Sequence, residues 1–252
     1  MHFYDEDDEV QYELNGGGGG GDNHDGRNKC KRKRGSKRKR PGADEKVPRP
    51  HLSESDVNTR CFLRKNHIYF YAGVSKESVY RLQDHLITIN TKYNDLVAKN
   101  REYSIQPTPI YLHINSFGGG VFAAFAAIDF IKQSALPVHT IIEGASASAA
   151  TLMSIVGKRR YIRKHASMLI HQLSSWFGGK LTEIDDDYQN VTEMHQQIKK
   201  LYVQHTRLGD SELEDVLKHD RWWNADKCLE TGLVDSVWDE VGDAPPASPS
   251  GA

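Results

Sequence analysis

The sequence predicts one α/β domain over residues 56–240. Three observations predict it: short aromatic or β-branched runs alternate with amphipathic segments, glycine-rich turns separate them, and 252 residues suffice for one full-sized domain. Repeated strand–turn–helix units of this length indicate parallel strands joined by right-handed crossovers. We therefore expect a sheet built largely by parallel pairing.

The first half of the domain has two predicted strands on either side of a helix. Residues 67–71 are a short aromatic and β-branched strand, and residues 110–114 are a second strand that ends in the glycine-rich turn 115–120. Ser75 is typical of a helix N-cap. The helix that follows it has apolar residues at helical spacing, namely Val79, Leu82, Leu86 and Ile89.

The second half continues the same alternation. Its predicted elements are a helix over 121–131, a strand over 138–143, a helix over 151–156, a buried strand over 168–170 and a long amphipathic helix over 182–206. The strand over 138–143 is expected to turn at Gly144 into the small-residue segment 145–150. Thr182, followed by Asp185 three residues later, is typical of the start of a helix.

Both ends of the chain have compositions typical of disorder. Residues 1–26 contain eight acidic side chains and no Lys or Arg, whereas residues 27–40 contain ten Lys or Arg and no acid. Six consecutive glycines at 16–21 and these self-repelling charges oppose compact packing. The mean hydropathy of −0.64 also indicates that part of the chain is unpacked. We therefore expect disordered tails at residues 1–55 and 241–252.

The charge runs and the cysteines bear on partners and compartment. The basic clusters within Lys31 to Arg40 resemble a nuclear localisation signal or a nucleic-acid-binding arm, and a merely solubilising tail is the open alternative. Three scattered cysteines (Cys30, Cys61 and Cys228) favour reduced thiols inside a cell over a disulfide scaffold or a zinc site. No apolar run reaches ~18 residues, so we expect no membrane span. We expect an intracellular, cytoplasmic protein, with the nucleus as the alternative.

Three segments contain residues that catalysis would use. Segment 144–150 places serines among small residues at a strand-to-helix turn, where free N–H groups favour a developing negative charge. His171 follows an apolar strand and suits a general base. The turn 115–119 can direct backbone N–H groups at an anion. Packing alone would also explain each segment, as an N-cap serine, a structural histidine and a tight turn. No G-x-x-x-x-G-K-[ST] motif occurs, so we expect no ATPase or kinase.

Together, the order and spacing of these segments resemble the proteolytic subunit of the Clp protease, a serine peptidase family of the ClpP/crotonase fold superfamily. The resemblance covers residues 58–238 and lies in five family motifs. Asn-Ser-Pro-Gly-Gly, Gly-x-Ala-x-Ser, Met-Ile-His-Gln, Asp-Arg-aromatic and Gly-Leu-(Val/Ile)-Asp match residues 115–119, 144–148, 169–172, 220–222 and 232–235. The family's long helix ending in His-Thr-Gly is similar to the segment that ends at residue 206.

The resemblance implies roles for five residues. Ser148 corresponds to the nucleophile that forms an acyl-enzyme, and His171 to the base that accepts its proton. Asp220 corresponds to the acid that orients the imidazole. The backbone N–H groups of Gly119 and Ala149 correspond to the oxyanion hole. The resemblance implies neither a cofactor nor a metal.

The chain departs from the family pattern in four places. Ser146 stands where the family usually has alanine, so it is a competing hydroxyl, although the spacing favours Ser148. Phe117 replaces the usual proline of the glycine-rich turn. Residues 94–108 are an insertion before the second strand. The family's N-terminal axial loop, which contacts the ATPase partner, has no recognisable match.

The resemblance also implies an architecture. The fold of the family consists of repeated β-β-α units with a protruding helix–strand handle. In this chain, residues 174–180 would be the handle strand. The long helix after it has apolar residues that need a partner, namely Val191, Met194, Ile198 and Leu201. The family forms heptameric rings whose handles interdigitate, which implies a homo-oligomer, up to a tetradecamer, around a chamber. An AAA+ unfoldase is a candidate partner. Trp222 and Trp223 would line a substrate pocket or pack in the core.

The implied function is a serine endopeptidase of the ATP-dependent Clp type that cleaves unfolded proteins or peptides inside this chamber. Three alternatives remain open. A catalytically inactive structural or regulatory ring subunit is one, although competent residues fill all three triad positions. A signal-peptide-peptidase-like enzyme would need a lysine in place of His171 and usually a membrane anchor. A coenzyme A-dependent lyase or hydratase would use similar backbone donors without the Ser/His/Asp set.

Overall fold

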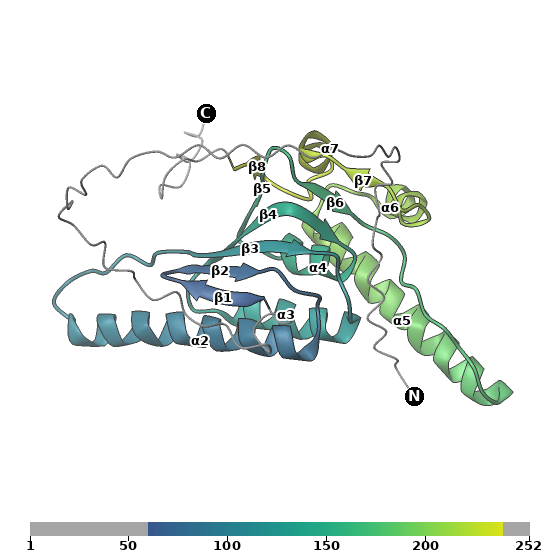
Figure 1. Ribbon diagram of the computed structural model, residues 1–252, viewed down its shortest axis with the longest axis horizontal. Coiled ribbons are helices and arrows are strands. Elements are labelled where there is room, and N and C mark those ends of the chain that lie inside the picture. The colour runs from purple at the N-terminus through teal and green to yellow at the C-terminus, as the bar shows by residue number, and fades with distance from the viewer. Residues whose placement is uncertain (1–59, 239–252) are drawn as a thin grey trace, which may run out of the picture. The chain divides into compact units, whose positions relative to one another are not determined.

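The computed structural model describes residues 60–238, so both predicted tails, and with them the basic clusters within 31–40, lie outside the described residues. The α/β alternation is confirmed within this range (Figure 1). The elements are β1 (Cys61–Arg64), β2 (His67–Phe70), α2 (Lys76–Lys99), β3 (Ile110–Ser116), α3 (Val121–Gln133), β4 (Val138–Ala147), α4 (Ala149–Ile155), β5 (Arg159–Ile162), β6 (Ser167–Leu169), α5 (Leu181–His205), α6 (Asp210–Leu217), β7 (Trp222–Trp223), α7 (Ala225–Glu230) and β8 (Ser236–Val237).

The described strands form one eight-stranded sheet that is mostly parallel. Strands β2, β3, β4, β5 and β8 pair in parallel in that order, and β1 pairs antiparallel with β2. β4 is long enough to serve two neighbours: residues 139–142 pair with β5, and residues 145–147 pair with β6. β7 then pairs antiparallel with β6. The path β3–β4–β6–β7 therefore brings four chain segments that are distant in sequence side by side.

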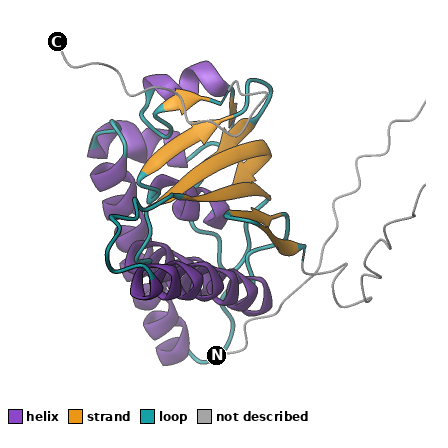
Figure 2. Cartoon of the chain, turned by 90° about the vertical axis from the view of Figure 1, so that its left-hand side faces the viewer, coloured by secondary structure: helices purple, strands orange, loops and turns teal. Residues whose placement is uncertain are grey.

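Helices gather on one side of the sheet, as Figure 2 shows. The predicted N-cap of α2 is confirmed, because the Ser75 hydroxyl accepts a hydrogen bond from the Ser78 N–H at 3.3 Å. The apolar residues predicted for this helix are all buried: Val79, Leu82, Leu86 and Ile89. They share one core with the strands and with α3 and α4, so the hydrophobic effect fixes these helices on the sheet.

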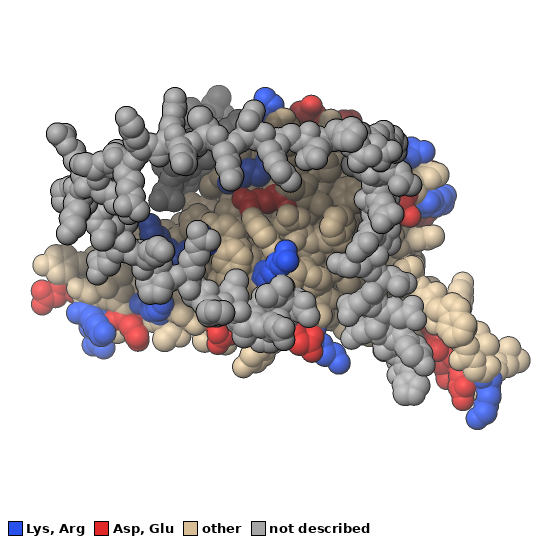
Figure 3. Space-filling model, viewed as in Figure 1, with Lys and Arg blue, Asp and Glu red and all other residues tan. Residues whose placement is uncertain are grey.

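The insertion expected at residues 94–108 lengthens α2 and adds a loop. The helix continues to Lys99, and Asn100 caps it through N–H bonds to the Leu96 and Val97 carbonyls. Along the lower edge of the molecule in Figure 3, which α2 forms, acidic and basic side chains are interspersed. Such a mixture of signs is typical of a solvated helix face.

β4 is longer than its sequence predicts, and the turn expected at Gly144 is wrong. The strand continues to Ala147 because it keeps a partner on each side: Ser146 pairs with Ser116 of β3, and residues 145–147 pair with β6. Gly144 absorbs the irregularity with a φ of 69°, opposite a register shift in β3. The sheet therefore holds this segment as far as Ala147, the residue before Ser148.

The start of α5 also differs from the prediction. Lys180, not Thr182, is the N-cap, and the Glu183 side chain accepts a hydrogen bond from its N–H at 3.0 Å. The helix projects from the body of the domain (Figure 1), as expected for a handle. No strand is formed over residues 174–180 of the described chain, since a strand requires a partner and no other described segment pairs with this one.

Candidate active site

The residues proposed for catalysis gather where β3, β4, β6 and β7 meet. Ser148 follows β4 directly, Ala149 begins α4, and Gly119 lies three residues beyond β3. His171 lies two residues beyond β6, and Asp220 lies two residues before β7. Because β3, β4 and β6 are parallel, their carboxyl ends lie at one edge of the sheet, which is where α/β proteins commonly build their sites.

The antiparallel pairing of β6 and β7 brings His171 and Asp220 together. Leu169 is paired with Trp222, so continuing that register by two residues sets His171 opposite Asp220. Their side chains lie 3.4 Å apart, from Nδ1 to Oδ1. The imidazole is 26% exposed, whereas the carboxylate is 76% exposed. The Asp220 carboxylate is therefore in place to orient the imidazole, and the carboxylate itself remains open to solvent.

Ser148 occupies a strained strand-to-helix turn. Its φ of 53° and ψ of −129° are unusual for a residue with a side chain and cost about 1–3 kcal/mol. Hydrogen bonds hold both of its peptide groups: its N–H donates to the Leu169 carbonyl at 2.9 Å, and its carbonyl accepts from Thr151. The bond to Leu169 ties this serine to the strand that leads into His171.

The support for this turn extends to α5. The Thr151 hydroxyl, which donates to the Ser148 carbonyl at 2.6 Å, also hydrogen-bonds the hydroxyl of the buried Tyr202. Sequence reasoning missed both residues, since a threonine within a helix and a tyrosine on an apolar face resemble ordinary packing residues. A buried polar pair that joins two helices fixes the backbone around Ser148.

The glycine-rich turn can approach Ser148 closely because residue 118 is a glycine. A Cβ at this position would lie 2.7 Å from the Ser148 Cβ and 2.8 Å from the Ala147 carbonyl oxygen. Its φ of 102° also disfavours any side chain. The sequence identified the turn but not this glycine as the one in contact with the serine.

The two backbone N–H groups expected to bind an oxyanion belong to Gly119, which follows Gly118, and to Ala149, which follows Ser148. Gly119 forms a β-bridge with Val74, and its hydrogen bonds are made by the residues on either side of Gly119. The Val74 N–H donates to the Gly118 carbonyl at 2.7 Å, and the Gly120 N–H donates to the Val74 carbonyl at 2.8 Å. This bridge does not use the N–H of Gly119 itself. Ala149 is the first residue of α4, and the first N–H groups of a helix have no partner within it. Both donors can therefore serve an oxyanion.

The other candidate nucleophiles in the described chain are shielded. Ser146 has no exposed surface, and its hydroxyl has no hydrogen-bond partner among the described residues. Burial raises the pKa of the Cys61 and Cys228 thiols to about 12, so neither forms a thiolate near neutral pH. Of the serines of segment 144–150, Ser148 alone is accessible to a substrate.

A separate polar cluster surrounds Glu143 in the middle of β4. Its carboxylate accepts hydrogen bonds from Tyr71, from His113 at 2.9 Å and from Arg163 at 3.2 Å. Burial alone would raise the pKa of Glu143, but these hydrogen bonds outweigh it and lower the pKa to about 2. The carboxylate is therefore ionised at all ordinary pH values and stabilises the sheet.

His139 lies near the start of β4 among aromatic rings. Burial, followed by the charge of Arg159, lowers its pKa to about 4, and its Nδ1 has no hydrogen-bond partner among the described residues. The ring lies against Tyr111 and Tyr161, with centroids 5.6 and 6.1 Å away. This histidine is a neutral packing residue, far along β4 from Ser148.

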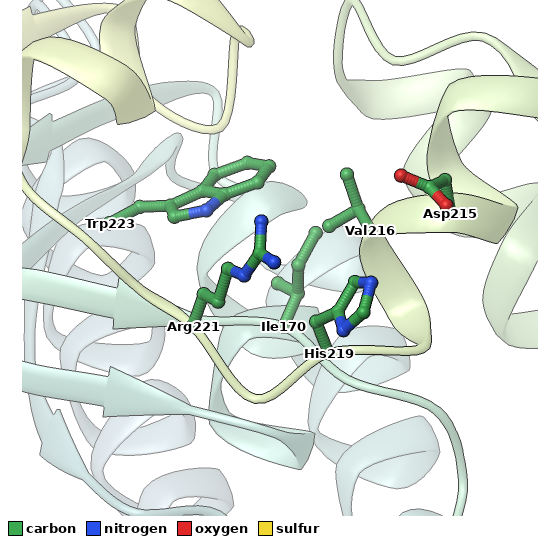
Figure 4. A pocket seen from close by; sticks show the side chains of 6 residues that line it. All are labelled: Ile170, Asp215, Val216, His219, Arg221 and Trp223. Carbon is green, nitrogen blue, oxygen red and sulfur yellow. The ribbon is translucent and has the colours of Figure 1, made fainter.

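Figure 4 shows a small pocket beside α6 and β7. Its lining residues are Ile170, Asp215, Val216, His219, Arg221 and Trp223. This lining includes none of the residues proposed for catalysis. Trp223, which lines the pocket, also packs against the core.

Over residues 60–238, no group of three or more His, Cys, Asp or Glu side chains is placed to hold a metal ion. None of the helices in this range is both long and apolar enough to cross a bilayer.

Comparisons with known proteins agree with this architecture. The sequence model of the Clp protease family matches residues 59–241. Proteolytic subunit 1 of the ATP-dependent Clp protease from Chlamydia muridarum is 32% identical over 133 residues, which cover 51% of this chain and 69% of that protein. The corresponding subunit of Protochlamydia amoebophila is 33% identical over 133 residues, which cover 51% of this chain and 65% of that one.

A solved structure has the same fold. A mutant of ClpP1 from Listeria monocytogenes superposes with a TM-score of 0.60 at 20% identity, over 70% of this chain and 93% of the other. The ClpP-like fold predicted from the sequence is thus confirmed. The chain belongs to the Clp protease family.

Proposed function

We propose that this chain is a serine endopeptidase in which Ser148 is the nucleophile, His171 the general base and Asp220 the acid that orients the imidazole. Ser148 attacks the scissile carbonyl, and His171 accepts its proton and returns it to the leaving amine. Gly119 and Ala149 stabilise the oxyanion through their N–H groups. Water then releases the acyl group from the serine.

The observation that carries this proposal is the convergence of three strand ends on Ser148. The Ser148 N–H bonds the last residue of β6, and the His171–Asp220 pair at 3.4 Å lies just beyond that residue. On the other side, Gly118 lies so close to the serine that no side chain would fit between them. Simple packing does not require a strained serine, a histidine–carboxylate pair and two helix- or turn-derived donors in one place.

We further propose that the active sites face a chamber enclosed by ring oligomers and that the substrates are unfolded polypeptides. The relatives' names describe a proteolytic subunit of an ATP-dependent protease, which makes an AAA+ unfoldase the expected partner. The protruding half of α5 supports assembly, since Leu181 and Tyr188 are 82% and 62% exposed there. Exposed apolar side chains on a projecting helix favour a protein partner.

Labelling with a fluorophosphonate probe tests the nucleophile. Wild-type protein and Ser146→Ala should be labelled at similar rates, because Ser146 is buried and has no role in the reaction. Ser148→Ala should not be labelled. Labelling that persists in Ser148→Ala would refute the assignment, and an unlabelled wild-type protein would favour the inactive ring subunit instead.

Mass photometry tests the chamber. The particle should be many times the mass of the 28.5 kDa chain, and Leu181→Asp should reduce it to smaller species if the exposed face of α5 is an assembly surface. A monomeric enzyme with full peptidase activity would contradict the chamber.

A further inference from the structure

Two buried hydroxyl groups, those of Thr151 and Tyr202, connect α5 to the turn at Ser148. The Thr151 hydroxyl donates its one proton to the Ser148 carbonyl at 2.6 Å. In its contact with Tyr202 it can therefore only accept, so the Tyr202 hydroxyl is the donor. Burial raises the pKa of Tyr202, which keeps this phenol protonated at ordinary pH values. The hydroxyl pair thus acts in one direction, from Tyr202 through Thr151 to the Ser148 carbonyl.

The Ser148 carbonyl belongs to the same peptide group as the N–H of Ala149. In a planar trans peptide the C=O and N–H bonds point in opposite directions. Two hydrogen bonds hold this carbonyl, one from the Thr151 hydroxyl and one from the Thr151 N–H at 2.9 Å. Because they fix the carbonyl on one side of the chain, they also fix the direction of the Ala149 N–H, which is a proposed oxyanion donor.

This peptide group needs support because the backbone of Ser148 is strained. Its φ is 53° and its ψ is −129°. Rotation of the Ser148–Ala149 peptide plane by about half a turn would bring this ψ to about 50°, in the left-handed region that residues with a side chain adopt more readily. The same rotation would turn the Ala149 N–H away from an oxyanion. It would also break the bond from Thr151, and because both hydroxyls are buried, water would not replace the lost bond.

We propose that Thr151 and Tyr202 are positioning residues that hold the Ala149 N–H toward the oxyanion. This inference rests on the proposed peptidase function. Tyr202 acts through Thr151, and Thr151 acts through the Ser148 carbonyl, so neither side chain touches the reacting atoms. Oxyanion donors act mainly in the transition state. The loss of either hydroxyl should therefore lower kcat and leave KM nearly unchanged.

Removal of each hydroxyl tests the pair. Thr151→Val should lower kcat on a fluorogenic peptide about tenfold, which is less than the loss of about 10²–10³-fold for a whole donor, because the Thr151 N–H still holds the carbonyl. Tyr202→Phe should lower kcat by about threefold or more. Thr151→Ser keeps a hydroxyl and should retain most of the wild-type kcat. The double variant Thr151→Val/Tyr202→Phe should be no slower than Thr151→Val, since the two hydroxyls act in series.

A peptide aldehyde provides a readout that a merely structural role would not change. Ser148 adds to the aldehyde carbon, and the aldehyde oxygen of this tetrahedral adduct lies where the oxyanion forms, so the adduct resembles the transition state. Thr151→Val should weaken the binding of the aldehyde about tenfold, in parallel with its effect on kcat, whereas KM for the peptide should change less than about twofold.

Two matched variants remove buried hydroxyls that are not part of the pair. Tyr161 is as buried as Tyr202, but its hydroxyl has no hydrogen-bond partner among the described residues, so Tyr161→Phe is the control for Tyr202→Phe. The Thr140 hydroxyl donates at 2.7 Å to the carbonyl of Ser154, at the other end of α4, so Thr140→Val is the control for Thr151→Val. Both controls should keep kcat within about twofold of wild type. Urea unfolding and mass photometry establish that each variant is folded and assembled like the wild-type protein.

The outcomes distinguish this inference from the function on which it rests. If Thr151→Val and Tyr202→Phe keep the wild-type kcat and aldehyde affinity, the positioning role is refuted and the peptidase assignment stands. Equal losses in the two control variants would also refute it, because a general loosening of the fold would then explain the effect. If the wild-type protein is neither labelled by a fluorophosphonate nor active on any peptide, the proposed function fails and the positioning role fails with it.

Discussion

Substitution of Gly118 by alanine perturbs the proposed site through a single methyl group. The new Cβ would lie 2.7 Å from the Ser148 Cβ, 2.8 Å from the Ala147 carbonyl oxygen and 3.1 Å from the Ala149 nitrogen. Two carbons normally approach no closer than about 3.5 Å, so relief of the clash requires a shift of about 1 Å. The atoms that would have to shift belong to the proposed nucleophile and one oxyanion donor.

The expected loss follows from this displacement. A 1 Å misplacement of reacting groups costs about 10²-fold in rate. Alanine at a φ of 102° also costs about 1–3 kcal/mol of stability. Gly118→Ala should therefore be labelled by a fluorophosphonate at least about 10²-fold more slowly than wild type, with a modest decrease in the free energy of unfolding measured in urea.

Gly120→Ala is the matched control. Gly120 lies in the same turn with an ordinary φ of −66°, and a Cβ there would meet nothing closer than 3.6 Å. This variant should be labelled within a few-fold of the wild-type rate. If Gly118→Ala is labelled as fast as Gly120→Ala while both are folded, the close approach of the turn to Ser148 has no catalytic role, and our account of the site is wrong.

Three further predictions concern charge. Asp220→Asn should lower kcat by about 10²–10⁴-fold with little change in KM, because the imidazole loses the acid that orients it; steady-state kinetics at neutral pH measure this, and a change below threefold would remove Asp220 from the triad. Because the pKa of Glu143 is lowered in the folded state, the ionised carboxylate stabilises the fold fully above about pH 4.5, and this stabilisation is lost as the pH falls toward about 2. In the wild-type protein the free energy of unfolding should therefore fall by about 3 kcal/mol over this pH range, and in Glu143→Gln this decrease should disappear. Urea unfolding at several pH values will show this. The lowered pKa of His139 means that the unfolded chain takes up a proton first, so stability falls as the pH drops from about 6.5 to about 4; His139→Phe should flatten that part of the profile, and an unchanged slope would show that His139 is not its source.

Much of the fold could be predicted from sequence because its signals are local. The N-cap at Ser75 and the apolar spacing of the helix that follows it depend on hydrogen bonds and side-chain periodicity within a few residues. The proposed site residues could be placed because the family motifs fix their order. The structure adds that β4, β6 and β7 bring Ser148, His171 and Asp220 to one edge of the sheet.

The features that could not be predicted depend on contacts between distant segments. The extension of β4 past Gly144 follows from partners on both sides, which the small residues of segment 145–150 do not indicate. β1, β5, β7 and β8 are two to four residues long, too short for a periodic pattern. The close approach of Gly118 to Ser148 and the hydrogen bond between Thr151 and Tyr202 exist only after folding.

A crystal structure of the protein after reaction with a fluorophosphonate tests the central claim most directly. Our account predicts phosphorus bonded to Ser148 Oγ, with one phosphonyl oxygen about 2.7–3.1 Å from the N–H nitrogens of Gly119 and Ala149 and the His171 imidazole beside the serine oxygen. An adduct on another residue, or a phosphonyl oxygen directed away from both N–H groups, would contradict it.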